Sequence, residues 1–220
     1  MRHILTTLVF LLPFKGLKVR LLRLLGHDIH PTASIGINFV QRVEHFSLAE
    51  GARIGHFNVF RFMKRVEMGR GSRMALFNWV LGGAGFEGNL EENPHLRTLR
   101  MGEGSVVISF HYLDCGGGVL MEDNSWLTGI RSTVLSHAFD PKDGGVILEP
   151  VILEKRSAAA TNCTLLPGAV LGEGALLAAG STLWTRQKAA AQCLHGGVPA
   201  RRLAPIDMPD SLYNRTERLG

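Results

Sequence analysis

A repeat of six residues constrains this chain more than any other feature of its sequence. Between residues 153 and 183 every sixth position is aliphatic or alanine: Leu153, Ala159, Leu165, Leu171, Leu177 and Leu183. Two residues before each of these lies a second set, small apart from its first member: Val151, Ser157, Cys163, Ala169, Ala175 and Ser181. Because side chains two residues apart share one face of a strand, each hexapeptide predicts a short strand with a large and a small inward residue.

The residues between these strands favour tight turns. Gly168, Gly172, Gly174 and Gly180 fall between the repeated positions, and glycine lets the backbone bend without a Cβ clash. A helix would repeat about every 3.6 residues, and this many glycines would destabilise it. The pattern therefore predicts an alternation of strands and corners.

Fainter copies of the pattern extend towards the N-terminus. They are the pairs Ile29 and Ile35, Leu48 and Ile54, Met68 and Met74, Met101 and Val107, and Met121 and Leu127. The repeat predicts a mainly-β solenoid in which each turn stacks on the next. We expect an amphipathic helix and cap over residues 1–28, the β domain over residues 29–186, and a C-terminal loop and tail over residues 187–220.

Two intervals between equivalent positions are longer than one coil. Leu171 follows Leu153 after three hexapeptides, but the intervals from Met68 to Met101 and from Met121 to Leu153 are each nearly twice as long. We therefore expect excursions near residues 82–97 and 138–150. Loops that leave a rigid scaffold commonly carry recognition.

A histidine stands at the mouth of the second excursion. His137 follows a run of apolar and small residues, and the six-residue frame slips by one residue between Leu127 and Val134. Such irregularities often re-aim a side chain towards a site. His137 is therefore the candidate functional residue, although an isolated histidine is more often structural.

The excess positive charge is confined to the N-terminus. Residues 1–27 hold five basic residues and no acidic ones, whereas the rest of the chain holds 19 of each. From Phe14 onwards, one predicted helical face is apolar and contains Phe14, Leu17, Leu21, Leu24 and Leu25. We expect either a cap docked on the β domain or peripheral contact of residues 1–25 with an anionic membrane. The apolar run over residues 4–12 is too short to span a bilayer, and the confined charge argues against nucleic-acid binding.

The cysteines indicate a reducing compartment. Cys115, Cys163 and Cys193 are odd in number and scattered, which predicts no disulfide framework. No clustered His/Cys spacing indicates a metal site. We expect a cytoplasmic protein, either free or peripheral at the inner face of the membrane.

These features together resemble the hexapeptide-repeat acyltransferases, the left-handed parallel β-helix family that includes the maltose, galactoside and colanic-acid O-acetyltransferases. The resemblance covers most of residues 29–203. It rests on the repeat, on a single histidine followed by a loop, on LLPGAVLGEGALLAAGS, and on GGVPARRL, which is similar to the family's Gly-x-Pro-Ala-Lys/Arg element. It implies left-handed coiling, a homotrimer of three-sided prisms with active sites between subunits, and acetyl-CoA as donor without a metal.

The resemblance also implies roles for individual residues. His137 would be the base that deprotonates the acceptor, and Asp140 is a candidate to orient its ring. The family positions that touch coenzyme A correspond to Thr161, Ala179 and Arg201, and Arg201, together with Arg202 and Arg186, could meet phosphate charge.

Some positions depart from the family pattern. Relatives often carry an asparagine near position 111, where this chain has His111, for which we expect a solvent-facing position. Ala158 stands where relatives often place a tryptophan, so either Trp126 or Trp184 would take that role, or the site is more open. A cysteine acyl-enzyme is disfavoured because Cys163 occupies a small inward position.

The predicted function is coenzyme A-dependent O-acetyl transfer to a sugar or saccharide hydroxyl, in surface polysaccharide biosynthesis. A metalloenzyme resembling the γ-class carbonic anhydrases would need three histidines around zinc, and a non-catalytic trimeric scaffold is the other alternative. The short segment before the first coil disfavours a sugar nucleotidyltransferase or a serine acetyltransferase. The acceptor, the acyl chain and the choice between O- and N-transfer remain open.

Overall fold

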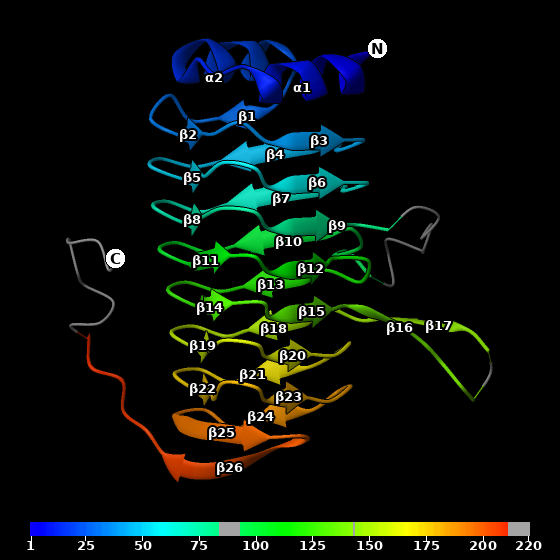
Figure 1. Ribbon diagram of the computed structural model, residues 1–220, viewed down its shortest axis with the longest axis vertical. Coiled ribbons are helices and arrows are strands. Elements are labelled where there is room, and N and C mark those ends of the chain that lie inside the picture. Colours follow the sequence, from blue (N-terminus) through cyan, green and yellow to red (C-terminus); the bar gives the residue numbers. More distant parts are fainter. Residues whose placement is uncertain (84–92, 143, 211–220) are drawn as a thin grey trace.

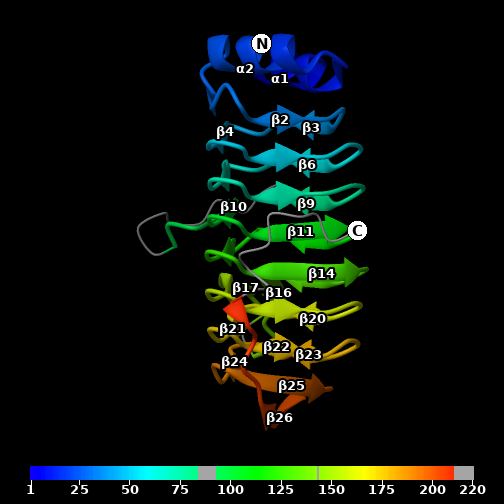
Figure 2. The same ribbon diagram turned by 90° about the vertical axis from the view of Figure 1, so that its left-hand side faces the viewer.

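Short parallel strands stack into three long sheets that form the sides of a prism, and two helices lie across one end (Figures 1 and 2). The structure is a computed structural model that describes residues 1–83, 93–142 and 144–210. The predicted mainly-β solenoid is confirmed.

Each sheet collects one strand from every coil. The first sheet contains, in spatial order, β1 (Asp28–Ile29), β4 (His45–Leu48), β7 (Arg65–Met68), β10 (Thr98–Met101), β13 (Val119–Met121), β18 (Val151–Leu153), β21 (Val170–Leu171) and β24 (Lys188–Ala189). The second contains β2 (Ser34–Ile35), β5 (Arg53–Ile54), β8 (Arg73–Met74), β11 (Val106–Ser109), β14 (Trp126–Ile130), β19 (Ala158–Ala159), β22 (Leu176–Leu177), β25 (Cys193–Gly197) and β26 (Ala200–Pro205). The third contains β3 (Phe39–Gln41), β6 (Val59–Arg61), β9 (Trp79–Leu81), β12 (Tyr112–Asp114), β15 (Thr133–Leu135), β20 (Thr164–Leu165) and β23 (Thr182–Leu183).

The hexapeptide positions build the core in register. Leu153 pairs with Leu171 in the first sheet, Ala159 with Leu177 in the second, and Leu165 with Leu183 in the third. All six side chains are buried. Three successive hexapeptides therefore complete one coil, and burial of this apolar column stabilises the stack.

The coils nearer the N-terminus are longer than three hexapeptides. Leu48 pairs with Met68 in the first sheet, and Phe60 pairs with Val80 in the third. Each of these coils therefore has two extra residues, which lie on the path from the third sheet to the first. This added length explains why the period of six is fainter upstream.

Two helices cover the N-terminal end of the prism. They are α1 (Arg2–Leu11) and α2 (Lys15–Leu24), separated by Pro13, whereas we expected one helix starting near Phe14. The docked face of α2 consists of Lys18, Val19 and Leu22, and the predicted apolar face is largely exposed. No described helix is long and apolar enough to cross a bilayer.

Polar groups fasten this cap to the first coils. The Lys18 ammonium donates hydrogen bonds to Phe10 O, at 3.0 Å, and to the Ile35 and Gly36 carbonyls, which lets a lysine lie buried. The His27 ring accepts from Phe46 N–H at 3.3 Å and contacts Thr6 Oγ1 at 3.1 Å. Burial lowers the pKa of His27 to about 4.

The other end closes with a hairpin. Strands β25 and β26 pair in antiparallel fashion below β22, so the stack continues past residue 186, where we expected it to end. Of the C-terminal tail, residues 211–220 lie outside the described residues.

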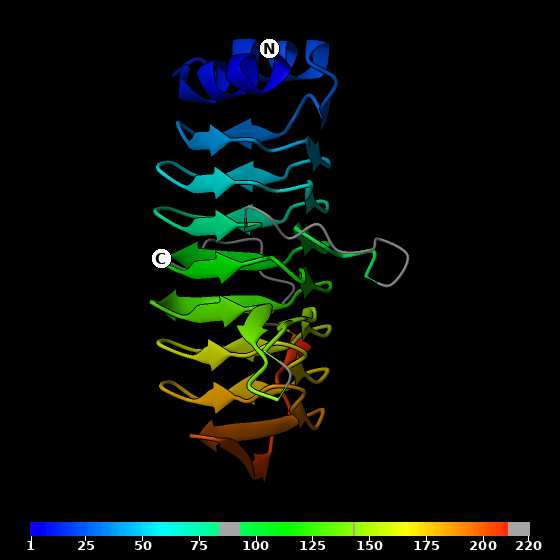
Figure 3. The ribbon, with the colours of Figure 1, turned by 90° about the vertical axis from the view of Figure 1, so that its right-hand side faces the viewer.

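Both excursions leave the prism at the same edge (Figures 1 and 3). The second is an antiparallel hairpin of β16 (His137–Phe139) and β17 (Val146–Leu148). The first connects β9 to β10, and its residues 84–92 lie outside the described residues. The predicted register slip is confirmed, because the pairing of β11 with β14 shifts between Leu127 and Ile130.

Candidate active site

The ring of His137 lies against a carboxylate from the neighbouring coil. Asp114 ends β12, and His137 begins β16 directly after β15, which pairs with β12 in parallel. His137 Nδ1 bonds to Asp114 Oδ2, and the His137 backbone N–H donates to the same oxygen at 3.3 Å. A carboxylate only accepts, so Nδ1 carries the proton and Nε2 of the neutral ring is left as an acceptor.

Asp114 is itself held rigidly. Its side chain is 3% exposed, whereas that of His137 is 38% exposed. Oδ1 accepts the Gly116 N–H at 2.9 Å, and Ser136 Oγ donates to Asp114 O at 2.7 Å while accepting the Gly117 N–H at 2.9 Å. A buried, fixed carboxylate therefore orients a ring that is open to solvent, as proton-transfer chemistry requires.

Asp140, which we expected to orient the His137 ring, lies instead at the tip of the β16–β17 hairpin. Asp140 Oδ1 accepts the Lys142 N–H at 2.9 Å and so caps the tip of the β16–β17 hairpin. Asp114 occupies the ring-orienting position that we had expected for Asp140. Stacking of coils brings residues of successive coils into contact, so distance along the sequence was the wrong guide.

The two excursions meet beside this pair. Asn93, at the end of the first, donates from Nδ2 to Gly117 O and to Leu148 O, both at 3.1 Å. Leu148 pairs with His137 in the second excursion. Glu149 follows, and its carboxylate accepts from Arg186 Nε at 2.8 Å. His137 therefore lies in a corner framed by both loops.

The candidate coenzyme residues gather at a different corner. Thr161 and Ala179 are exposed in successive turns between the second and third sheets, linked by Gly180 N–H to Thr161 O at 2.9 Å. Arg201 pairs with Gly196, beside the same turn, and is exposed. The Arg202 guanidinium donates to Cys193 Sγ at 3.1 Å. We call these four residues, which lie in the last coils and in the closing hairpin, the candidate coenzyme group.

Thr161 and Ala179 lie at the opposite edge of the third sheet from His137. Thr161 and Ala179 precede third-sheet strands, whereas His137 follows one. Within one chain these two residues are therefore separated from the histidine–carboxylate pair by the width of the sheet.

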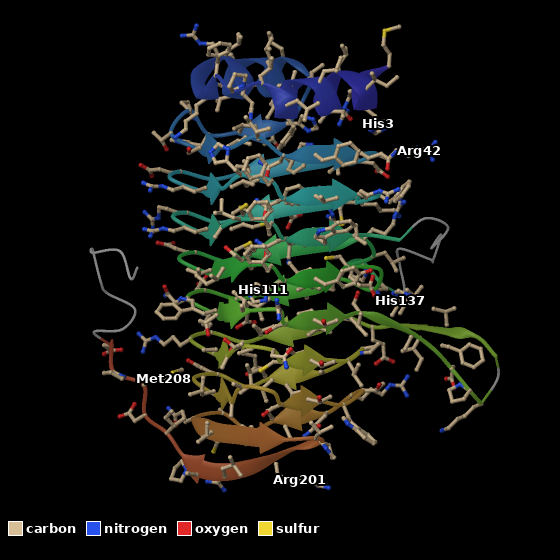
Figure 4. The ribbon with its side chains drawn as sticks, viewed as in Figure 1. His3, Arg42, His111, His137, Arg201 and Met208 are labelled. Carbon is tan, nitrogen blue, oxygen red and sulfur yellow. The ribbon has the colours of Figure 1, made fainter. Side chains whose placement is uncertain are left out.

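The other histidine near the third sheet is buried. His111 directly precedes β12, is 1% exposed and accepts the Ser132 N–H on Nδ1 at 3.1 Å. Figure 4 shows His111 and His137 well apart across the sheet. Burial lowers the pKa of His111 to about 4. The expectation of a solvent-facing position is wrong, because this position continues an internal ladder.

That ladder consists of buried polar side chains stacked at one corner. Asn38 Oδ1 accepts Asn58 N–H at 2.8 Å, Asn58 Oδ1 accepts Asn78 N–H at 2.9 Å, and Asn78 Oδ1 accepts His111 N–H at 2.9 Å. The even spacing of these asparagines is visible in the sequence and could have predicted that His111 is buried. Each bond satisfies a buried amide.

The remaining candidate residues are the cysteines, the metal-ligating side chains and the tryptophans. Burial raises the pKa of the Cys115 and Cys163 thiols, which opposes a thiolate nucleophile. No three metal-ligating side chains gather among the described residues. Trp184 is 53% exposed at the corner column of His137, two coils further on, whereas Ala158 is buried in β19.

Comparison with known proteins identifies the architecture. No protein-family model and no curated protein sequence matches the chain. A candidate acetyltransferase from Bacillus cereus is 16% identical, with a TM-score of 0.56 over 81% of this chain and 87% of the other. A single-residue mutant of AntD, an N-acyltransferase from Bacillus cereus in complex with dTDP and coenzyme A, is 19% identical, with a TM-score of 0.54 over 73% and 80%.

A third structure agrees with these two. A hexapeptide transferase family protein from Anaplasma phagocytophilum is 17% identical, with a TM-score of 0.50 over 85% of this chain and 83% of the other. Likeness at such low identity is evidence of fold rather than of substrate. The chain therefore has the left-handed parallel β-helix fold of the hexapeptide-repeat acyltransferases.

Proposed function

We propose that this protein transfers the acetyl group of acetyl-CoA to a hydroxyl of a saccharide, with His137 as the general base. The observation that carries this proposal is the hydrogen bond from His137 Nδ1 to buried Asp114, which fixes the Nδ1–H tautomer and so makes Nε2 the acceptor nitrogen of a partly exposed ring. A sugar hydroxyl is a poor nucleophile near neutral pH, and a positioned imidazole raises its reactivity by ~10² to 10⁴.

The reaction balances with one base. Nε2 accepts the hydroxyl proton as the oxygen attacks the thioester carbonyl carbon, and the developing imidazolium is stabilised by Asp114. The carbon–sulfur bond then breaks, and the imidazolium returns the proton to the departing sulfur. The products are an acetyl ester and coenzyme A, with no covalent enzyme intermediate and no demand on the buried cysteines.

We propose that the active enzyme is a homotrimer in which neighbours complete each site. The coenzyme group of Thr161, Ala179, Arg201 and Arg202 would then serve the histidine of an adjacent subunit. An exposed aromatic column beside the third sheet supports close self-association. Phe57 and Phe77 stack at 5.2 Å between ring centroids, and Phe77 and Phe110 at 5.1 Å.

The saccharide acceptor rests on the resemblance and on the bound dTDP of AntD. Because AntD is an N-acyltransferase, a sugar amine is the competing acceptor. A role in surface polysaccharide biosynthesis and a location at the inner face of the membrane belong to the same proposal.

The test is thiol release from acetyl-CoA across a panel of sugars, nucleotide sugars and amino sugars. Turnover with a sugar hydroxyl supports the proposal, and turnover confined to amines replaces it with N-acetylation. No thiol release with any acceptor, together with no binding of coenzyme A in calorimetry, would favour the non-catalytic scaffold.

The trimer has its own test. Sedimentation equilibrium should give three times the chain mass, and Phe77→Glu should reduce it because a charge would enter the aromatic column. Leu24→Glu, at an exposed position of the N-terminal cap and away from both corners, is the matched control. A monomeric wild-type protein that turns over acetyl-CoA would refute shared sites.

A further inference from the structure

We propose that the outward face of the N-terminal cap is a docking surface for an anionic lipid bilayer. This outward face consists of the side chains that point away from the prism: Ile4, Leu8 and Leu11 of α1, Leu17 and Leu24 of α2, and Phe14 between the helices. It goes beyond the proposed transfer reaction, because it assigns a second surface, remote from His137, to a different partner.

The outward face is exposed although it is apolar. Ile4 is 67% exposed, Phe14 65% and Leu24 83%. In α1 the outward residues recur at intervals of four and three, and in α2 at an interval of seven, which places each set on one side of its helix. A contiguous exposed apolar surface of this kind marks an interaction site rather than chance exposure.

Docking on the prism does not account for this face. The inward side of α1 buries Val9 and Phe10, and the inward side of α2 buries Val19 and Leu22. Phe10 packs on Phe46 of the first coil with 4.7 Å between ring centroids. The cap is thus apolar on both sides, and a helix that is apolar all round is normally covered on both.

The geometry suits a flat partner. Both helices lie across the end of the prism, transverse to its long axis, and their side chains project from the end of the molecule (Figures 1, 2 and 4). Membrane-surface helices lie in the plane of the interface with one apolar face buried. A bilayer at this end would contact both helices at once. Side-by-side packing of prisms in the proposed trimer would leave the outward face of the cap uncovered.

The positive charge of the N-terminal cap favours an anionic lipid surface over a second copy of this chain as the partner. Arg20 lies on the same side of α2 as Leu17 and Leu24. Lys15 and Arg23 are also exposed in this helix, and none of the three forms an ion pair with a described residue. Residues 1–27 contain no acidic side chain. Two such faces end to end would oppose like charges, whereas anionic headgroups complement them.

This orientation also restricts the acceptor, a step that rests on the proposed function. His137 follows β15, the fifth strand of the third sheet from the cap. With coils about 4.8 Å apart and a helix layer about 10 Å thick, His137 would stand ~30 Å from the lipid. Phospholipid headgroups extend only ~5 to 7 Å from the hydrocarbon. Among acceptors anchored in the same bilayer, the distance therefore selects an extended saccharide on a lipid carrier over a headgroup or a first carrier-linked sugar.

Co-sedimentation with vesicles tests the docking surface directly. The wild-type chain should bind phosphatidylcholine vesicles that contain phosphatidylglycerol, and bind pure phosphatidylcholine and high-salt samples far more weakly. Leu8→Glu with Leu24→Glu should reduce binding about tenfold or more, because charges would enter the apolar interface. Leu203→Glu, at the opposite end of the prism and 60% exposed, is the matched control.

A second pair of variants tests the charge. Arg20→Glu with Arg23→Glu should weaken binding to phosphatidylglycerol vesicles by a similar factor, while Arg53→Glu with Arg73→Glu, on the side of the prism, should leave it unchanged. Circular dichroism checks that every variant is folded. His137→Ala should bind vesicles like the wild type, which separates this surface from the transfer reaction.

Three outcomes overturn the proposal. They are absence of wild-type vesicle binding, equal losses in the control variants, and cap variants that lower the mass of the free protein without affecting vesicles. The last outcome would assign the face to a second copy. For the acceptor, equal turnover of a carrier-linked monosaccharide and a carrier-linked oligosaccharide would refute the distance argument and leave docking intact.

Discussion

Two histidines at opposite edges of the third sheet have contrasting surroundings. His111 is buried at one corner, where its Nδ1 accepts a backbone N–H and its pKa is lowered to about 4. His137 lies half-exposed at the other corner, with Nδ1 on the carboxylate of Asp114. The same imidazole thus belongs to a buried hydrogen-bond ladder at one edge and is a partly exposed ring held by a carboxylate at the other. The partner of Nδ1, rather than the residue type, decides the role.

The largest expected effect is at His137. We expect His137→Ala to lower kcat for acetyl transfer by ~10² to 10⁴, because the base is removed, and to leave coenzyme A binding unchanged. The unfolding free energy should fall by about 1 to 3 kcal/mol, because buried Asp114 loses its hydrogen-bond donor. Steady-state thiol release, calorimetry and urea denaturation measure the three quantities. His30→Ala, exposed in the first coil, is the control. Undiminished turnover would remove His137 from the mechanism.

The next effect concerns the carboxylate behind the ring. We expect Asp114→Asn to lower kcat by ~10- to 100-fold, since an amide neither fixes the tautomer nor stabilises the imidazolium. Asp140→Asn should stay within about twofold, because Asp140 only caps the hairpin turn. Its pH–rate profile should match the wild type, whereas that of Asp114→Asn should shift. Equal losses in both variants would contradict the assignment of Asp114.

At the edge of the third sheet that holds His111, substitutions should lower the stability of the fold. His111→Ala leaves the Ser132 N–H without its acceptor and opens a cavity, so we expect a loss of about 1 to 3 kcal/mol in unfolding free energy. His111→Asn should lose less, because an amide can continue the ladder that Asn78 ends. Urea denaturation measures both. If activity per folded molecule fell as far as in His137→Ala, the contrast between the two edges would fail.

The last expected effect is a pH dependence of stability. The pKa values of His27 and His111 are lowered to about 4 by burial, so between about pH 6.5 and 4 the unfolded chain binds more protons at these residues. Stability from them is complete above about pH 6.5 and is lost as the pH falls towards 4. The urea midpoint of His111→Asn should fall less steeply than that of the wild type. Parallel curves would show that His111 does not titrate in this range.

Sequence spacing located His137 but not its partner. The long interval between Met121 and Leu153 predicted a loop, and the register slip placed a re-aimed side chain at its mouth. Asp114 was not found because its contact depends on which residues of successive coils align. The even recurrence of Asn38, Asn58 and Asn78 indicated which residues of successive coils align at the corner of His111. Only the continuous ladder in the structure shows that this corner is closed to solvent.

The sequence by itself determined the path of the chain: hexapeptide strands, glycine corners and the points where loops depart. Those features depend on neighbours a few residues apart, whose periodicity is visible in a linear string. Only the tertiary structure decided that Asp114 orients His137, that His111 is buried, that Thr161 and Ala179 lie on the far edge of the third sheet, and that the cap is apolar outside as well as inside. Each of these depends on stacking between coils or on which side of a helix is covered, and period alone specifies neither.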